Sequence, residues 1–174
     1  MQGKGKIHVY YGDGKGKTTA GMGQVIRAAG SGLQVLVFQF LKDNSGNERK
    51  ILETIPKVTL LPGRDHVKFL NQMNRQELAD LKHYNTKALD EIVKFCSPFD
   101  VLFMDEILCA TQYGVLSEEK LLRFLEQKPR GLEIIMTGQE ATDKILEISD
   151  YATQMTKVKH PYDRGVSARE GIEF

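Results

Sequence analysis

Gly12-Asp13-Gly14-Lys15-Gly16-Lys17-Thr18-Thr19 is the stretch on which the interpretation of the whole chain depends. It follows a β-type run over residues 7–11. It precedes a helix-type run whose apolar residues follow the spacing i, i+3, i+4, i+7: Met22, Val25, Ile26 and Ala29. A strand, a glycine-rich turn and a helix together form the context of a phosphate-binding P-loop. The stretch therefore predicts a nucleotide-binding protein.

The residue types of this loop suit phosphate chemistry. Glycines allow backbone N–H groups to converge on one anion, and the helix that follows adds the positive end of its dipole. Lys17 supplies a mobile charge for phosphate oxygens, and Thr18 supplies a hydroxyl for Mg²⁺. Tyr11 stands where the usual P-loop pattern has its first glycine, which argues against an ordinary kinase or GTPase loop. The alternative is a glycine turn in a Rossmann-like domain that binds no nucleotide.

Composition limits the other classes of function. The 174 residues include 24 basic and 23 acidic ones, so the net charge of +1 gives no electrostatic argument for nucleic acid or a membrane surface. No apolar stretch is long enough to span a membrane, and residues 1–6 lack the apolar region of a secretory signal. Cys96 and Cys109 lie in apolar runs without metal or redox spacing. We expect one domain over residues 1–174 in a cytoplasmic protein.

Strand-type and helix-type runs alternate along the chain. Mostly apolar strand-type runs occupy residues 34–40, 58–61, 101–106, 133–138 and 152–158. One face of a long helix is marked by a set of apolar residues: Leu78, Leu81, Ala88, Leu89, Ile92, Val93 and Cys96. Shorter helices are expected near 48–54, after Ser117 and over 142–148. This alternation predicts an α/β protein with a mainly parallel sheet covered by helices on both faces.

A second chemical motif is Asp105-Glu106, at the carboxyl end of an apolar strand. Ligands of open α/β sheets bind outside these strand ends, where the P-loop also opens. An acid at this place typically serves Mg²⁺, directly or through water. The alternative is that Asp105 caps the helix-type run that follows. Glu106 is a candidate metal ligand or a base in a hydrolase, and the residues alone leave both open.

Four further polar residues are weaker candidates for nucleotide contacts. Gln39 and Lys42 flank the end of the second strand-type run and are equally consistent with ordinary strand-end residues. Glu48 begins a short helix and suits a solvated first turn. Arg27 lies within the first helix and suits a surface charge.

Several segments resemble the P-loop type of ATP:corrinoid adenosyltransferases. The resemblance rests on the P-loop through Ala20, on residues 27–32, 39–42 and 46–49, on Met104-Asp105-Glu106, on residues 116–129 and on Thr137-Gly138. The ending, residues 158–165 and 168–174, is the most diagnostic part. The family's Thr-Gly-Arg reads Thr137-Gly138-Gln139 here, and Phe69 is the one aromatic residue of the stretch 63–69.

The resemblance implies a RecA-like P-loop fold and a definite reaction. Family members use an outside electron donor to reduce a corrinoid to Co(I), which attacks the ribose 5′ carbon of ATP and releases triphosphate. The family holds ATP reversed relative to kinases and is typically homodimeric. The motif match implies Mg²⁺ at Thr18 and Glu106, with Asp105 near it, and a triphosphate on Lys17 and the backbone of residues 14–18. It places four more residues near the nucleotide: Arg27, Gln39, Lys42 and Glu48.

Two other functions remain open on the residues alone. One is a P-loop NTPase or nucleotide-binding regulator without corrinoid activity. The other is a pure interaction module with a vestigial loop, against which Lys17, Thr18 and Asp105-Glu106 argue. We also expect the polar stretch from Pro62 to Asn74 to lie over the site and to contact the corrin, because it joins a strand to the long helix.

Overall fold

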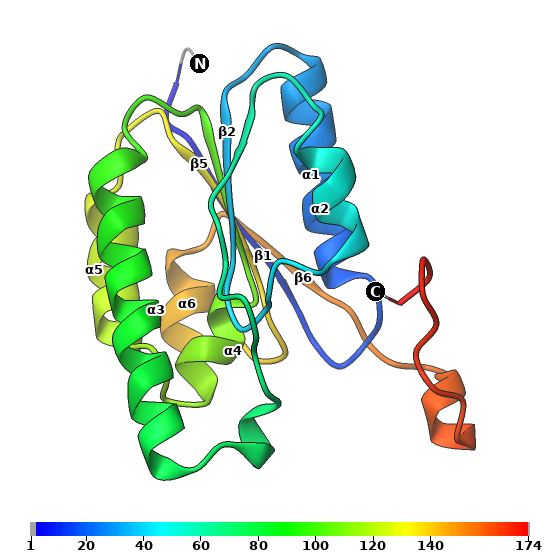
Figure 1. The fold of residues 1–174 in the computed structure, drawn as a ribbon. Coiled ribbons are helices and arrows are strands. Elements are labelled where there is room, and N and C mark those ends of the chain that lie inside the picture. The colour runs from blue at the N-terminus through cyan, green and yellow to red at the C-terminus, as the bar shows by residue number, and fades with distance from the viewer. Residues whose placement is uncertain (1–2, 174) are drawn as a thin grey trace.

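The computed structural model describes residues 3–173 of the chain (Figure 1). Met1, Gln2 and Phe174, the last residue of the C-terminal motif, lie outside the described residues. A central sheet separates two layers of helices, and α1 and α2 lie on one side of it while α3 to α6 lie on the other (Figure 1). The C-terminal segment after the sheet returns to the end of α1 at which the P-loop lies.

Six parallel strands form the sheet in the order β3-β2-β4-β5-β1-β6. This arrangement confirms the predicted fold class. Strand β5 lies between β1, which leads into the P-loop, and β4, which carries Asp105. The strands are β1 Ile7–Tyr11, β2 Val35–Gln39, β3 Val58–Leu60, β4 Val101–Asp105, β5 Glu133–Thr137 and β6 Tyr151–Gln154.

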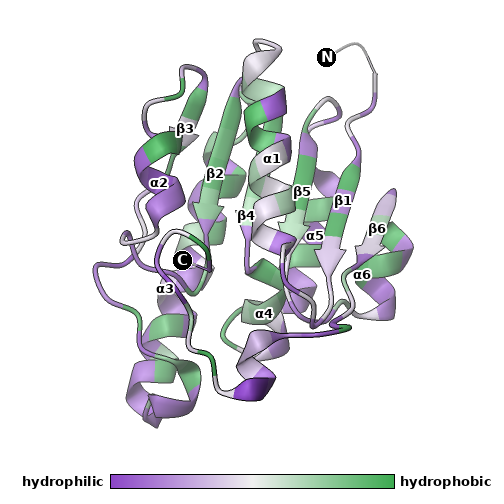
Figure 2. Cartoon of the chain, turned by 90° about the vertical axis from the view of Figure 1, so that its right-hand side faces the viewer, coloured by the Kyte–Doolittle hydropathy of each residue, from purple (hydrophilic) through white to green (hydrophobic). Residues whose placement is uncertain are grey.

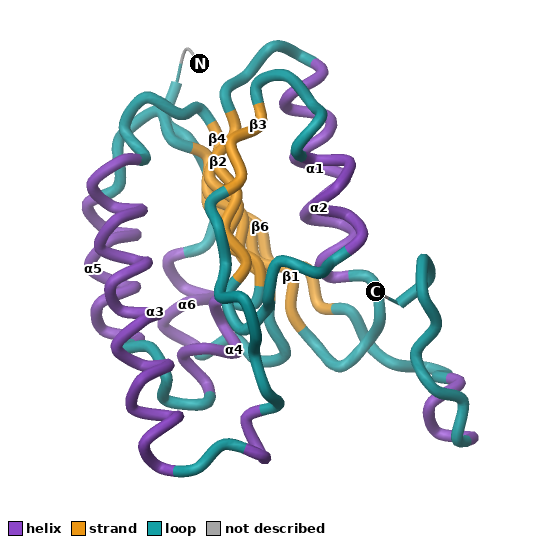
Figure 3. Tube along the Cα trace, in the orientation of Figure 1, coloured by secondary structure: helices purple, strands orange, loops and turns teal. Residues whose placement is uncertain are grey.

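Three of the α-helices, α3, α5 and α6, begin at capping side chains. Asn74 and Glu77 form a reciprocal capping box at the start of α3, and the side chains of Ser117 and Thr142 accept backbone N–H groups at α5 and α6. The α-helices are α1 Lys17–Gly30, α2 Asn47–Leu52, α3 Arg75–Phe95, α4 Ile107–Gln112, α5 Glu118–Gln127 and α6 Asp143–Ile148. Short 3₁₀ turns cover Leu70–Gln72 and Pro161–Arg164 (Figure 3).

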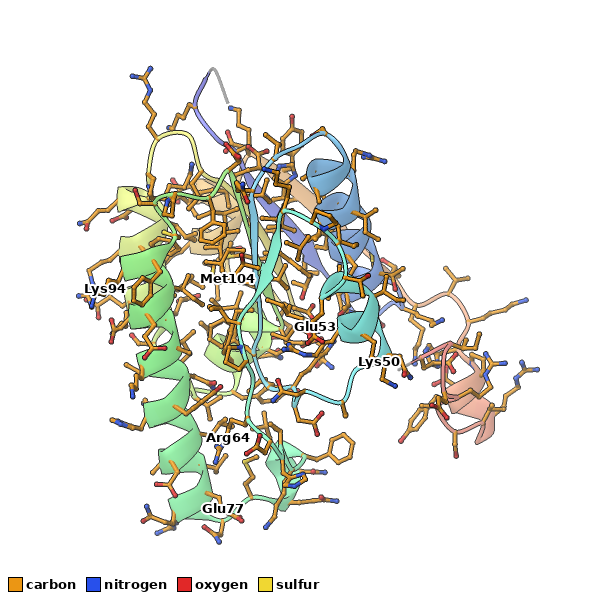
Figure 4. All side chains as sticks on the ribbon, turned by 45° about the horizontal axis from the view of Figure 1, so that its top comes forward. Lys50, Glu53, Arg64, Glu77, Lys94 and Met104 are labelled. Carbon is orange, nitrogen blue, oxygen red and sulfur yellow. The ribbon has the colours of Figure 1, made fainter. Side chains whose placement is uncertain are left out.

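Alternation along β4 divides the core into two layers. Val101 and Phe103 pack with α1, whereas Leu102 and Met104 pack with α3 and α4. Figure 2 shows the apolar strands between the two helix layers, and Figure 4 shows Met104 on the α3 side. Because both faces of the sheet are covered, its central strands are apolar on both faces up to their polar end residues.

Three details differ from the sequence-based expectations. The apolar spacing predicts that Ile26 and Val93 are buried, but they are 50% and 44% exposed because their helices bury narrower stripes than this spacing implies. The last strand begins earlier and is shorter than predicted, at Tyr151–Gln154. Glu106 does not continue β4, since its backbone turns to φ 58° and starts the connection to α4.

Residues 3–173 contain no helix that combines the length and the apolar character needed to cross a lipid bilayer. The two cysteines are buried and free, as expected from their apolar surroundings.

Two glycines of α1 give a matched test of the α1–sheet packing. A Cβ atom on Gly21 would lie 2.5 Å from the Phe103 ring, whereas a Cβ atom on Gly23 would meet no atom within 4 Å. We expect Gly21→Ala to lower the free energy of unfolding by ~1–3 kcal/mol through overpacking. Gly23→Ala should raise it by ~0.5–1 kcal/mol, because alanine is the better helix former. Urea denaturation measures both, and equal effects of the two substitutions would contradict the packing described.

Candidate active site

Polar residues end three neighbouring strands on the face that α1 covers. Val37 and Phe103 face α1, so the alternation places Gln39 and Asp105 on the same face two residues later. Ile135 places Thr137 there in the same way. The register pairs Gln39 with Asp105. Strand alternation and register therefore bring these three side chains together at the start of α1.

Asp105 is fully buried and accepts hydrogen bonds from four side chains. Its Oδ1 accepts from Thr18 Oγ1 at 2.9 Å and from Thr137 Oγ1 at 2.6 Å. Its Oδ2 accepts from Lys42 Nζ at 2.8 Å and from Gln39 Nε2 at 3.2 Å. Asp105 is therefore not a helix cap; the residue at the N-cap of α4 is Glu106, whose side chain makes no capping bond. The buried carboxylate is tolerated here because both of its oxygens accept hydrogen bonds from neighbouring side chains.

The P-loop has the backbone that its glycines predict. Gly12 and Gly16 have φ values of 115° and 111°, in the region that favours glycine. Lys17 Nζ donates to the Gly14 carbonyl at 2.6 Å, so the lysine folds back along the loop. Lys17 and Thr18 are the first two residues of α1, at its positive end.

The segment that follows β6 is hydrogen-bonded to the P-loop. The Gly14 N–H donates to the Met155 carbonyl at 2.8 Å, and the Lys157 N–H donates to Asp13 Oδ1 at 2.9 Å. A Cβ atom on Gly12 would lie 2.3 Å from the Met155 oxygen. Glycine at position 12 is therefore required by this close approach as well as by its φ.

Lys42 links the loop, β4 and α2 electrostatically. Its Nζ donates to Thr18 Oγ1 at 3.3 Å as well as to Asp105, and it lies 3.8 Å from Glu48 Oε1. Burial lowers the pKa of Lys42, but the charge of Asp105 and the hydrogen bond to it outweigh burial, so the net pKa lies above the ordinary 10.5. Lys42 therefore stays a cation through the neutral range.

A pocket of about 570 Å³ opens beside Lys42 at the carboxyl edge of the sheet. Two of its lining residues, Leu41 and Glu106, have positive φ values of 57° and 58°, which non-glycine residues rarely adopt. Glu106 is held in this conformation by its N–H, which donates to Thr137 Oγ1 at 2.8 Å. The other lining residues are Lys42, Cys109, Tyr113, Gln139 and the stretch Val67, Lys68, Phe69, Leu70 and Asn71.

A second pocket, of about 350 Å³, lies on the other side of Lys42. Its walls are Thr18, Thr19 and Met22 of α1, Asn47 and Glu48 of α2, Lys42, and the C-terminal residues Gly171, Ile172 and Glu173. Glu173 lies 3.7 Å from Lys15 of the P-loop. Hydrogen bonds from the Arg169 side chain and backbone lower the pKa of Glu173 to about 2, so its carboxylate is ionised. Lys42 contributes to the walls of both pockets.

The donor set at Thr18 suits Mg²⁺. Within residues 3–173, no three His, Cys, Asp or Glu side chains gather as they do in a metal centre built by protein alone. Mg²⁺ typically binds through one or two carboxylates together with substrate phosphates and water. The ammonium of Lys42 hydrogen-bonds both Thr18 Oγ1 and Asp105 Oδ2, so these two oxygens lie close enough to face one cationic group.

The structure thus brings most of the predicted site residues together. Gly12, Gly14 and Gly16 form the loop, and Lys17 begins α1. Asp13 accepts the Lys157 N–H, Lys15 lies near Glu173, and Thr19 lines the second pocket. One bonded cluster, with Glu106 next to it in the sequence, is formed by Thr18, Gln39, Lys42, Glu48 and Asp105. Arg27 does not join them. It lies in the last turn of α1, about 15 Å along the helix from Lys17 by its rise per residue, and it donates to Gln24.

Two members of the cluster were missed by the sequence reasoning. Thr137 donates to Asp105, and Arg49 donates to Gln39 Oε1 at 3.3 Å while being only 4% exposed. The alternation of β5 carried a signal for Thr137, because it continues the face of Ile135. For Arg49 the sequence offered no such signal, because a cation in a short polar helix is normally exposed.

Fold and loop together define a P-loop protein of the α/β class. A solved structure titled EssC (ATPases 2 and 3) from Geobacillus thermodenitrificans shares this fold, with a TM-score of 0.53 over 96% of this chain and 35% of that one. Its sequence identity is 14%, so the likeness concerns the fold alone.

Sequence comparison identifies the family. Residues 3–174 match the ATP:corrinoid adenosyltransferase BtuR/CobO/CobP family, and the chain belongs to it. It is 32% identical to a corrinoid adenosyltransferase of Sinorhizobium sp, covering 98% of this chain and 81% of that one. It is 30% identical to the corrinoid adenosyltransferase of Escherichia coli (strain K12), covering 98% and 86%. The resemblance seen in the sequence is thereby confirmed.

Cys109 provides a test of the pocket beside Glu106. Burial, followed by the charge of Glu106, raises the pKa of Cys109 to about 12, so the thiol stays neutral up to strongly alkaline pH. We expect iodoacetamide at about pH 8 to leave Cys109 unmodified in the folded protein and to modify it after denaturation. Peptide mass spectrometry reports the modified fraction. Fast alkylation of the folded protein would contradict this environment.

Proposed function

We propose that the protein transfers the 5′-deoxyadenosyl group of ATP to the Co(I) centre of a reduced corrinoid and releases triphosphate. Membership of the ATP:corrinoid adenosyltransferase family over residues 3–174 carries this proposal. The site supports it, because a P-loop, a buried Asp105 cluster and two pockets that share Lys42 in their walls lie together at the carboxyl edge of the sheet.

The two pockets suggest how ATP lies. The pocket near Phe69 and Tyr113 is the larger of the two and has aromatic and apolar side chains beside its polar ones, so we assign to it the adenosine and one face of the corrin. The triphosphate then follows the P-loop past Lys42 toward the smaller pocket and Thr19. This places the 5′ carbon on the Glu106 side, reversed relative to a kinase. Glu173 must move or be neutralised by a cation when triphosphate reaches Lys15, because like charges repel.

The reaction forms one bond and breaks one bond. The electron pair of Co(I) attacks the 5′ carbon, a cobalt–carbon bond forms, and cobalt becomes Co(III). The bond from the 5′ carbon to the α-phosphate oxygen breaks, and triphosphate leaves with that electron pair. Lys17, Lys42 and the N–H groups at the start of α1 stabilise the charge that develops on the leaving group. Because no proton is transferred in this step, the protein's task is positioning and charge stabilisation.

Mg²⁺ would be held by Thr18 and Glu106, with Asp105 behind them, and would neutralise phosphate charge. Gln39 and Glu48 would lie next to the nucleotide, because their hydrogen bonds hold them in this cluster. The reaction also needs an electron donor that reduces the corrinoid to Co(I). We further propose that the 174 residues act as one domain, in a homodimer, in the cytoplasm.

Residues 62–74 are proposed to contact the corrin. They run along the carboxyl edge of the sheet between β3 and α3 and include the 3₁₀ turn (Figure 3). Asn44 holds Gly63 through two hydrogen bonds, of 2.7 and 3.2 Å, which anchors the start of the stretch. Phe69 lines the larger pocket although it is 77% exposed, so its ring is available to a flat ligand.

The fate of ATP tests the proposed function. With ATP, Mg²⁺ and chemically reduced corrinoid, we expect triphosphate and adenosylated corrinoid in equal amounts, because the bond at the 5′ carbon breaks. Phosphorus NMR distinguishes triphosphate from ADP and phosphate. Without corrinoid, ATP should stay largely intact. Formation of ADP at the same rate with and without corrinoid would assign the protein to the NTPases instead.

Glu106→Gln tests the metal role of the carboxylate beside the larger pocket. The substitution keeps the size of the side chain but removes its charge, so we expect a higher Mg²⁺ requirement and a rate lower by roughly 10–100-fold. The rate is measured against Mg²⁺ concentration. Glu140→Gln, at an exposed position outside the proposed site, should match the wild type. A wild-type curve for Glu106→Gln would remove the metal role from this residue.

A further inference from the structure

Arg49 is a cation inside the protein with an incomplete set of partners. It is only 4% exposed, and its Nε has no hydrogen-bond partner among the described residues. Glu53 lies 4.0 Å from Nη2, but the Glu53 side chain is 60% exposed to water. Burying a guanidinium group without a close carboxylate costs free energy. The contacts of Arg49 should therefore show what offsets this cost.

The two terminal nitrogens of Arg49 bind two different elements. Nη1 donates to Gln39 Oε1 at 3.3 Å, at the end of β2, and Nη2 donates to the Leu61 carbonyl at 3.2 Å, just after β3. Arg49 thereby ties helix α2 to the carboxyl ends of two strands. The second bond is structural, whereas the first reaches into the Asp105 cluster.

The chemistry of the neighbours fixes how the Gln39 amide is turned. Arginine can only donate, so the amide atom that faces Arg49 is the oxygen. Ionised carboxylates can only accept, so the atom that faces Glu48 and Asp105 is the nitrogen. Gln39 Nε2 lies 3.2 Å from Glu48 Oε1 and 3.2 Å from Asp105 Oδ2. Both constraints agree, and the amide nitrogen acts as a shared donor between two carboxylates.

We infer that Arg49 is a positioning residue that acts through Gln39 to hold the Glu48 and Asp105 carboxylates at a fixed separation beside Lys42. This inference rests on the proposed function, since it concerns the metal and nucleotide side of the same site. Without Arg49, Gln39 Oε1 is a buried acceptor with no donor, and rotation of the amide would turn its oxygen toward a carboxylate. Glu48, Lys42 and Thr18 would then lose their common alignment.

Substitutions of Arg49 and Gln39 should have coupled effects on activity. Arg49→Met keeps an apolar chain without a donor, and Gln39→Leu removes the shared amide. We expect each to lower kcat roughly 10–100-fold and to raise the Mg²⁺ requirement, with little change in KM for the corrinoid. The double variant should be no slower than either single variant, because both break one connection. Arg49→Lys, which restores one donor, should recover part of the rate.

Glu53→Gln is the matched control. It removes the ion pair between Arg49 and the exposed Glu53 carboxylate and leaves Gln39 unchanged, so kcat and the Mg²⁺ curve should equal those of the wild type. Glu53 and its neighbour Lys50 on α2 are labelled in Figure 4. Loss of the Leu61 bond should appear separately, as a lower urea midpoint, and rates are measured where every variant is folded.

The outcomes separate this inference from the proposed function. Wild-type kcat and Mg²⁺ dependence in Arg49→Met, or multiplied losses in the double variant, would overturn the role of Arg49. If the wild type itself forms no adenosylated corrinoid, the proposed function fails. In that case calorimetric titration of the same variants with Mg²⁺ and ATP still decides the inference: coupled losses of affinity support it, and independent or absent losses refute it.

Discussion

The hydrogen bonds to the buried Asp105 carboxylate are the interactions on which the site depends. Donors from three elements meet on it: Thr18 at the start of α1, Thr137 at the end of β5, and Lys42 after β2. Because this carboxylate is buried, it needs each of these donors: a buried charge without hydrogen bonds costs free energy. The same bonds fix the phosphate-binding loop against the sheet, so the stability of this region and the geometry of the site have one origin.

Strand alternation explains why these groups meet. The residues that pack β2, β4 and β5 against α1 are apolar until each strand ends, and the next residue on that face is polar. The P-loop places the positive end of α1 over this row. This one arrangement underlies the proposed binding of an anion at the loop and of a cation at Thr18, beside the pocket that Phe69 lines. A reaction that transfers a group from a triphosphate ester to a reduced metal centre requires such positioning and charge stabilisation.

Much of this arrangement could be predicted from the sequence, because it follows from local patterns. The P-loop, the parallel sheet and the strand-end Asp105 all follow from spacing and composition. What escaped prediction depends on contacts between distant segments: Met155 against Gly14, Glu173 against Lys15, and Arg49 under Gln39. Arg27 shows the converse, since its motif match suggested a nucleotide contact while the helix places it at the far end of α1. Positive φ at Leu41 and Glu106 likewise had no local signal.

Substitution of Asp105 by asparagine tests this account most directly. The side chain keeps its size, but its nitrogen cannot accept a hydrogen bond and would face donors that now lack a partner. Calorimetric titration with Mg²⁺ and ATP measures the consequence for binding. The account predicts that the affinity of Asp105→Asn falls at least about tenfold, as expected when a buried charged acceptor is lost. An affinity equal to that of the wild type, in a variant with native circular dichroism, would contradict the claim that this carboxylate organises the site.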